Sequence, residues 1–214
     1  TATGQHLGSF YLDLHPRKGK RNGAWCMPLR MEEAQEPHLA ALVANFGTES
    51  RRREALMWRY IVHRELGSDA KIAYNNNGAP VLENRAEHIS VSHSADFVAV
   101  IISNQRCAID IERLDRNFER VATRYMRPDE ENLSSDERLR AVVWCAKEAL
   151  YKYAGERGLD LLHDIKLLAV DFERAELLGQ IKDNPPVRMQ MTFHSGNVVR
   201  NCAARAARRA IPLK

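Results

Sequence analysis

The chain has 214 residues, of which 44% are hydrophobic and 28% are charged, and its formal net charge is +4. This length allows one large domain or two small ones with an ordinary buried core. No run approaches the roughly 18 consecutive apolar residues of a membrane span, and residues 1–9 lack the charged-then-apolar pattern of a secretion signal, so we expect a cytoplasmic protein. The charge favours an acidic partner but is too small to imply nucleic acid.

The cysteines form no metal or disulfide pattern. Cys26, Cys107, Cys145 and Cys202 are scattered without a Cys-x-x-Cys pair. This spacing argues against a zinc knuckle, a thioredoxin-like site and a dense disulfide framework. We therefore expect reduced thiols that are mostly buried.

The first elements in chain order are a strand and two helices. Residues 10–14 predict a strand, and residues 37–46 predict a helix. Residues 49–66 place apolar side chains at helical spacing with arginines between them, and Gly67 follows as a stop. This second helix is the clearest element of the first half.

A turn and three strands follow. Residues 75–80 predict a turn because Asn and Gly tolerate positive φ and Pro fixes the exit. Residues 89–93 and 107–112 alternate, and residues 97–102 are continuously apolar and β-branched. These patterns predict three strands in succession.

The rest of the chain repeats the sequence of a helix followed by strands. A third helix is predicted at residues 136–153 and ends at Gly155. Strands are predicted at 165–172 and 187–193, whereas the Ala- and Arg-rich residues 201–210 fit either a helix or a strand. We infer an α/β (α+β) fold whose two halves, residues 1–104 and 105–214, hint at an internal duplication.

Two acidic residues fall on one face of a predicted strand. The two-residue period of a strand puts Asp110 and Glu112 on one face and Ile109 and Ile111 on the other. Neighbouring carboxylates ionise together most readily when a cation lies between them. The same pattern also occurs on solvated strand faces, so a metal site needs a third ligand.

The helix predicted at residues 136–153 offers that ligand. Trp144, Glu148 and Lys152 are spaced four apart and share one face of the helix. Three carboxylates without imidazole or thiolate suit Mg²⁺, which takes its remaining ligands from water and substrate phosphates. Lys152 would meet those phosphates. A surface ion pair between Glu148 and Lys152 fits the same spacing.

Other polar residues suit phosphate binding. Ser92, His93 and Ser94 end a predicted strand, where an imidazole and two hydroxyls can hydrogen-bond a phosphate, and Arg59 belongs to a strongly basic helix. The sequence contains no Gly-x-x-x-x-Gly-Lys or Gly-x-Gly-x-x-Gly loop, which weighs against a standard kinase or dehydrogenase. No Gly-x-Ser-x-Gly elbow surrounds Ser92 or Ser94, so the sequence does not indicate a hydrolase triad.

Four motifs follow one another along the chain: Gly78-x-Pro80, Ile-Ser-Val-Ser-His-Ser at 89–94, Ile-Asp-Ile-Glu at 109–112, and the helix at 144–152. Their order resembles that in the phosphopantetheinyl transferases, in particular the single-chain type that includes the surfactin-synthetase activator. The resemblance covers about half of the chain. It implies two similar α/β subdomains in a pseudo-twofold arrangement, with coenzyme A in the cleft between them.

The resemblance also implies roles for individual residues. In the family, acids that match Asp110, Glu112 and Glu148 bind Mg²⁺ together with the coenzyme A pyrophosphate. His93 inherits a phosphate contact, and Arg59, Lys147 and Lys152 are implied as further coenzyme A contacts. The family often has a basic residue near the adenine where this chain has Ala79.

The implied reaction transfers 4′-phosphopantetheine from coenzyme A to a serine of an apo acyl carrier protein or peptidyl carrier domain, as in fatty acid biosynthesis. The serine hydroxyl attacks the β-phosphorus, adenosine 3′,5′-bisphosphate leaves, and Glu148 is the implied general base, with Lys152 and Asp110 also catalytic. The resemblance further suggests a monomer without nucleic-acid or membrane partners.

Two alternatives remain at this point. A non-catalytic module that binds coenzyme A or a carrier protein would keep the same fold. A metal-dependent nuclease would also use paired acids, although such enzymes commonly place a lysine two residues after an acid, where this chain has Arg113-Leu114 after Glu112.

Overall fold

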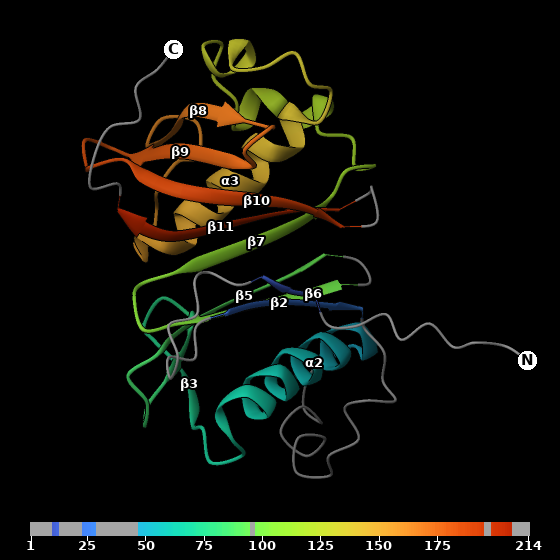
Figure 1. Ribbon diagram of the computed structural model, residues 1–214, viewed down its shortest axis with the longest axis vertical. Helices are drawn as coiled ribbons and strands as arrows, with labels where there is room; N and C mark the ends of the chain where they lie inside the picture. Colours follow the sequence, from blue (N-terminus) through green and yellow to red (C-terminus); the bar gives the residue numbers. More distant parts are fainter. Residues whose placement is uncertain (1–9, 13–22, 29–46, 95–96, 195–197, 207–214) are drawn as a thin grey trace, which may run out of the picture.

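The structure is a computed structural model that describes residues 10–12, 23–28, 47–94, 97–194 and 198–206. It is a mixed α/β protein with two main sheets, each covered by one long helix (Figure 1). A short hairpin, β3 (Ile72–Tyr74) with β4 (Pro80–Leu82), lies beside the first sheet.

The first sheet has the strand order β1-β2-β6-β5, and all its neighbouring strands are antiparallel. Helix α2 (Glu49–Leu66) covers this sheet, and its buried residues Ile61 and Val62 belong to the same core as Val98 and Val100 of β6. The strands of this sheet are β1 (Phe10–Leu12), β2 (Gly23–Pro28), β5 (His88–Ser94) and β6 (Phe97–Ser103).

Local signals set both ends of α2. The Thr48 side chain accepts a hydrogen bond from the Arg51 backbone N–H at 3.3 Å, which satisfies one of the free donors of the first turn. At the other end Gly67 has φ +101, a conformation that glycine adopts readily. The predicted helix is confirmed with the same bounds.

The second sheet has the order β7-β11-β10-β9-β8 and is antiparallel throughout. Helix α3 (Leu139–Ala154) packs on it and ends at Gly155, which has φ +64. The last described strand lies inside the sheet, between β7 and β10. The strands are β7 (Ala108–Arg113), β8 (Ile165–Asp171), β9 (Glu176–Ile181), β10 (Val187–His194) and β11 (Val198–Ala206).

A thin apolar layer joins the two sheets. Alternate residues of β6 face α2, while Ala99 and Ile101 form a cluster with Ile109 and Ile111 of β7. The edge strands β5 and β7 lie in contact across this joint, although they belong to different sheets (Figure 1). The joint therefore brings one polar strand from each sheet together.

Several predicted boundaries change in the structure. Helix α3 begins at Leu139 rather than at residue 136, because the Asp136 carboxylate accepts the Arg138 N–H at 2.9 Å and holds a turn there. Residues 201–206 are part of strand β11, which resolves the helix-or-strand alternative up to Ala206. The predicted helix at 37–46 lies outside the described residues.

Some elements have no counterpart in the prediction. They are the strands β2, β3, β4 and β9, and the short 3₁₀ helices η2 (Glu119–Arg124) and η3 (Glu130–Asn132). Within the described part of the chain, no helix is long and apolar enough to cross a membrane. Cys107 and Cys145 are buried thiols that form no disulfide among the described residues, as expected, while the side chains of Cys26 and Cys202 lie outside the described parts.

Gly179 tests the packing of α3 on its sheet. A Cβ atom at this position in β9 would lie 2.4 Å from Leu150 Cδ1 in the buried core, so Gly179→Ala has to displace Leu150. We expect a loss of about 1–3 kcal/mol in the free energy of unfolding, measured by urea denaturation. Gly47→Ala is the control, since a Cβ there meets nothing within 4 Å. Equal stability of the two variants would contradict this packing.

Candidate active site

The acidic pair of β7 lies where the two sheets and α3 meet. As the strand period predicts, Ile109 and Ile111 enter the apolar joint, while Asp110 and Glu112 contact side chains of β5 and α3. Asp110 is buried and Glu112 is partly buried. The pair is thus held inside the protein rather than on a solvated strand face.

Asp110 receives two donors on one oxygen. The Ser92 hydroxyl of β5 and the Lys152 ammonium of α3 each donate to Oδ1 at 2.7 Å. Lys152 Nζ also lies 3.2 Å from the Ile109 carbonyl oxygen and 3.5 Å from that of Val91. The second oxygen, Oδ2, is buried and has no hydrogen-bond partner among the described residues.

Glu112 is held by three donors. Trp144 Nε1 and Arg116 Nη1 donate to Oε1 at 2.8 and 2.9 Å, and the Ser94 hydroxyl donates to Oε2 at 3.3 Å. The Arg116 guanidinium also lies 4.9 Å from the centre of the Trp144 ring. Arg116 was not among the predicted site residues, because it lies in a turn after β7, where no periodic pattern marks its direction.

Glu148 of α3 is the third carboxylate of the group. Burial raises its pKa, and the charges of Asp110 and Glu112 raise the pKa further, while Lys152 opposes the effect. Burial and the Asp110 charge likewise raise the pKa of Glu112, which Trp144 and Arg116 partly offset. The carboxylates therefore repel one another across the joint, and a bound cation would relieve that repulsion.

Asp110, Glu112 and Glu148 have the chemistry of ligands for a divalent cation, although their carboxylates do not converge on one position in this structure. The described residues contain no cluster of at least three His, Cys, Asp or Glu side chains close enough to hold a metal ion as they stand. Carboxylate oxygens are nevertheless the ligands that Mg²⁺ prefers, and the buried Oδ2 of Asp110 lacks a partner. Side-chain rotations of Glu112 and Glu148 would have to complete such a site.

His93 lies on the opposite face of β5 from Ser92 and Ser94. Its Nδ1 is 3.4 Å from Glu54 Oε2 of α2, and its side chain is 54% exposed. The two-residue period of the strand separates it from the acidic pair. His93 can therefore contact a ligand that extends beyond the joint.

Arg59 and Lys147 have partners within the protein. Arg59 is only 7% exposed, donates to the Ala55 carbonyl at 2.9 Å and to the Tyr74 hydroxyl at 2.8 Å, and lies 4.1 Å from the Trp58 ring centre. It thereby fixes Tyr74, whose side chain is largely exposed. This places Arg59 in a supporting position instead of directly at the acidic pair.

Lys147 is fully buried. Its ammonium pairs with Glu130 Oε2 at 2.8 Å and donates to the carbonyl oxygens of Tyr125 and Leu161 at 2.6 and 3.0 Å. Both members of the ion pair have 0% exposed side chains. All three ammonium protons are thus used inside the core, so Lys147 does not join Glu148 and Lys152 at the joint.

Glu130 completes this internal network. Its Oε1 accepts the Leu167 backbone N–H at 2.7 Å, next to the register shift of β8, and its Oε2 also accepts the Arg127 N–H at 2.8 Å. The network ties η3 and β8 to α3. The sequence did not predict a role for Glu130, because its partner Lys147 lies 17 positions further along the chain and a turn-rich segment separates the two.

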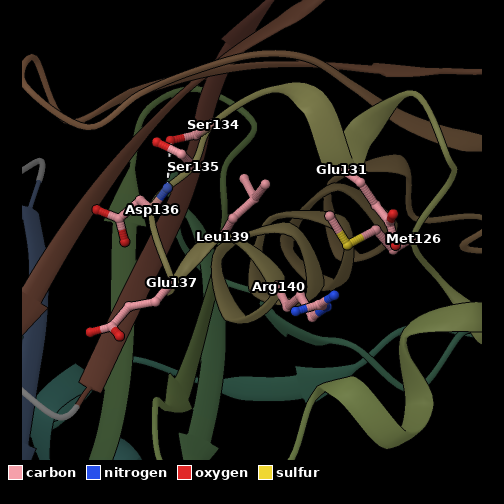
Figure 2. Close-up of a pocket in the computed structure, with 8 residues that line it drawn as sticks. All are labelled: Met126, Glu131, Ser134, Ser135, Asp136, Glu137, Leu139 and Arg140. Atoms are coloured by element: carbon pink, nitrogen blue, oxygen red, sulfur yellow. Dashed lines mark hydrogen bonds between the residues drawn. The ribbon is translucent and has the colours of Figure 1, made fainter.

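A small pocket lies at the start of α3, apart from the acidic group (Figure 2). Its volume is about 190 Å³, and within it the Ser134 hydroxyl accepts the Asp136 N–H at 3.1 Å. None of the predicted site residues lines it. Its lining residues are Met126, Glu131, Ser134, Ser135, Asp136, Glu137, Leu139 and Arg140.

A known family model matches the part of the chain that carries the acidic group. Residues 106–202 match the model of the 4′-phosphopantetheinyl transferase superfamily. The matched segment runs from just before β7 into β11 and includes Asp110, Glu112, Glu148 and Lys152. It supports a transferase of the phosphopantetheinyl kind, and it lies within the second sheet and its helix.

A second match concerns the other end of the chain. Residues 1–64 match the model of peptidase family M3. This segment contains no His-Glu-x-x-His, the helical motif of many zinc peptidases. The match therefore identifies no catalytic residue in the described part of the segment.

Lys147→Met tests the buried ion pair. Removing the ammonium leaves the Glu130 charge buried without its partner, so we expect the free energy of unfolding to fall by about 3–5 kcal/mol. Urea denaturation monitored by circular dichroism measures it. Lys182→Met is the control: it breaks an exposed pair with Glu156 at 3.1 Å, and should cost less than about 1 kcal/mol. A similar small loss for Lys147→Met would contradict the described network.

Glu148→Gln tests the repulsion between the carboxylates. A carboxyl group with a raised pKa binds its proton more readily in the folded protein, so its ionisation above that pKa destabilises the fold. In metal-free buffer at pH 7.5 we expect the variant to melt higher, by on the order of 2 °C. The gain should shrink as the pH falls through the raised pKa toward the ordinary value of 4.5.

The exposed Glu173, in the turn between β8 and β9, provides the matched control. Glu173→Gln should leave the melting temperature unchanged across the same pH range. A Glu148→Gln variant that is less stable than the parent at pH 7.5 would show that the charge is stabilised in the folded protein.

Proposed function

We propose that the protein is a single-chain phosphopantetheinyl transferase of the surfactin-synthetase-activator type. It transfers 4′-phosphopantetheine from coenzyme A to a serine of an apo acyl or peptidyl carrier protein and releases adenosine 3′,5′-bisphosphate. The observation that carries this proposal is the meeting of Asp110, Glu112, Glu148 and Lys152 at the joint, within the segment that matches the superfamily.

The main difficulty of this reaction is charge, because a nucleophile has to approach an anionic pyrophosphate. Mg²⁺ held by Asp110, Glu112 and Glu148 would supply the positive charge that the pyrophosphate needs. The Lys152 ammonium, already at the acidic pair, is positioned to hold a phosphate oxygen. His93, exposed on the other face of β5, would contact a more distant phosphate of coenzyme A.

Glu148 is suited to accept the proton of the attacking serine. It belongs to the acidic group that would hold the metal and the pyrophosphate, so it lies beside the proposed point of attack and can take the proton directly or through a water molecule. Glu148 and Lys152 then come from one helix, α3, whereas His93 comes from β5. Arg59 holds Tyr74 and Lys147 holds Glu130, so the hydrogen bonds described for these two predicted coenzyme A contacts are made within the protein.

The architecture agrees with a cleft between two similar subdomains. Residues 1–104 contain one sheet with α2, and residues 105–214 contain a second sheet with α3. We propose that these halves are related by a pseudo-twofold axis and that coenzyme A binds between them. The net charge of +4 suits an acidic carrier protein as partner. We further propose that the enzyme acts as a monomer in the cytoplasm.

The decisive experiment measures the intact mass of an apo acyl carrier protein after incubation with the protein, coenzyme A and Mg²⁺. Transfer adds about 340 Da to the carrier serine. Glu148→Gln should lower the rate by at least about 100-fold, whereas Glu173→Gln should match the parent. Removal of the metal with EDTA should stop the reaction, and added Mg²⁺ should restore it.

A different result would redirect the assignment. Coenzyme A binding without a mass gain on several carrier proteins would indicate a binding module without catalysis. Full activity of Glu148→Gln would remove that residue from the proposed chemistry.

A further inference from the structure

We propose that Ser92 is a positioning residue that turns Asp110 so that Oδ2 alone faces a bound cation. The inference rests on the proposed function, because it concerns how the chain presents a carboxylate to a divalent metal ion. It assigns Ser92 to the protein's own acidic group rather than to coenzyme A.

The first support is a row of serines on β5. Ser90, Ser92 and Ser94 occupy alternate positions of the strand and all face β7. The Ser90 hydroxyl accepts the Ile109 N–H at 3.2 Å, and Ser92 and Ser94 donate to Asp110 and Glu112. The three serines of β5 thus meet Ile109, Asp110 and Glu112 of β7 in chain order.

This row replaces a backbone ladder. Strands β5 and β7 are edge strands of different sheets, and residue numbers rise together along both of them in these contacts. Edge strands carry free backbone donors and acceptors that have to be satisfied in a buried joint. Serine hydroxyls do this for the Ile109 N–H and, at the same time, fix the acidic side chains.

The second support is that the two carboxylate oxygens of Asp110 differ in their hydrogen bonds. Oδ1 receives both Ser92 and Lys152 at 2.7 Å, whereas the buried Oδ2 has no partner in the described part of the chain. A buried carboxylate oxygen without a donor is unfavourable unless a ligand meets it. The arrangement leaves one oxygen of Asp110 available to a cation.

The third support is that the Ser92 hydroxyl has no further proton to donate. A hydroxyl carries one proton, and Ser92 donates that proton to Asp110. A phosphate therefore cannot receive a hydrogen bond from the Ser92 hydroxyl while this contact is in place. His93, one residue on, is open to solvent and has no such restriction.

The test compares metal binding with coenzyme A binding in Ser92→Ala. Hydrogen bonds to metal ligands usually contribute about 10- to 100-fold in metal affinity. We expect the dissociation constant for Mn²⁺, measured by electron paramagnetic resonance without coenzyme A, to rise at least about 10-fold. The Mg²⁺ concentration for half-maximal transfer should rise in parallel, while the KM for coenzyme A at saturating Mg²⁺ stays within about twofold.

Two further variants separate positioning from general damage. Ser92→Thr keeps the hydroxyl and should retain Mn²⁺ affinity close to that of the parent. Ser90→Ala removes a buried hydroxyl from the same face of β5 without touching a carboxylate, so it should bind Mn²⁺ like the parent. Should Ser92→Ala not fold by circular dichroism, Ser92→Cys keeps the shape with a weaker donor and should also lose Mn²⁺ affinity.

The outcomes distinguish this inference from the proposed function. Unchanged Mn²⁺ affinity in Ser92→Ala, together with a raised KM for coenzyme A, would overturn the inference and leave the transfer reaction intact. A parent protein that neither binds Mn²⁺ nor modifies a carrier protein would overturn both.

Discussion

The joint between β5 and β7 is the constraint on which the site depends. Two edge strands meet there without a shared ladder, so side chains have to satisfy the groups that the joint buries. Lys152 reaches across it from α3 to Asp110 and the carbonyl oxygens of Val91 and Ile109. One ammonium thus links both sheets and the helix. The same contacts that hold the molecule together also arrange its acidic residues.

The acidic group illustrates a conflict between stability and function. Glu112 and Glu148 have raised pKa values because they are buried beside Asp110, so their charges destabilise the fold. A protein selected only for stability would replace one of them with an uncharged residue. Their presence together is understandable if a ligand cation stabilises the group in the working enzyme. Trp144 and Arg116 limit the cost at Glu112 by donating hydrogen bonds.

Much of this arrangement follows from short-range periodicity. The alternation of β7 predicts that Asp110 and Glu112 share a face, and the four-residue spacing of α3 predicts that Glu148 and Lys152 face them. The partner of Lys147 could not be predicted, since Glu130 is distant in sequence and precedes the helix in an irregular segment. Periodicity describes which face a residue occupies, whereas long-range packing decides what that face meets.

The place of β11 in the second sheet has a consequence for biosynthesis. Strand β7 pairs with β11, and about 90 residues separate the two along the chain. A growing chain that has reached only β10 leaves β7 without this pairing partner, although β5, β6 and α3, which also contact β7, have already been made. The strands that pair in the first sheet and the helix α2 that covers it all precede β7 in the chain, so this half can form earlier. The acidic strand would therefore gain its backbone partner in the second sheet only after β11 has been synthesised.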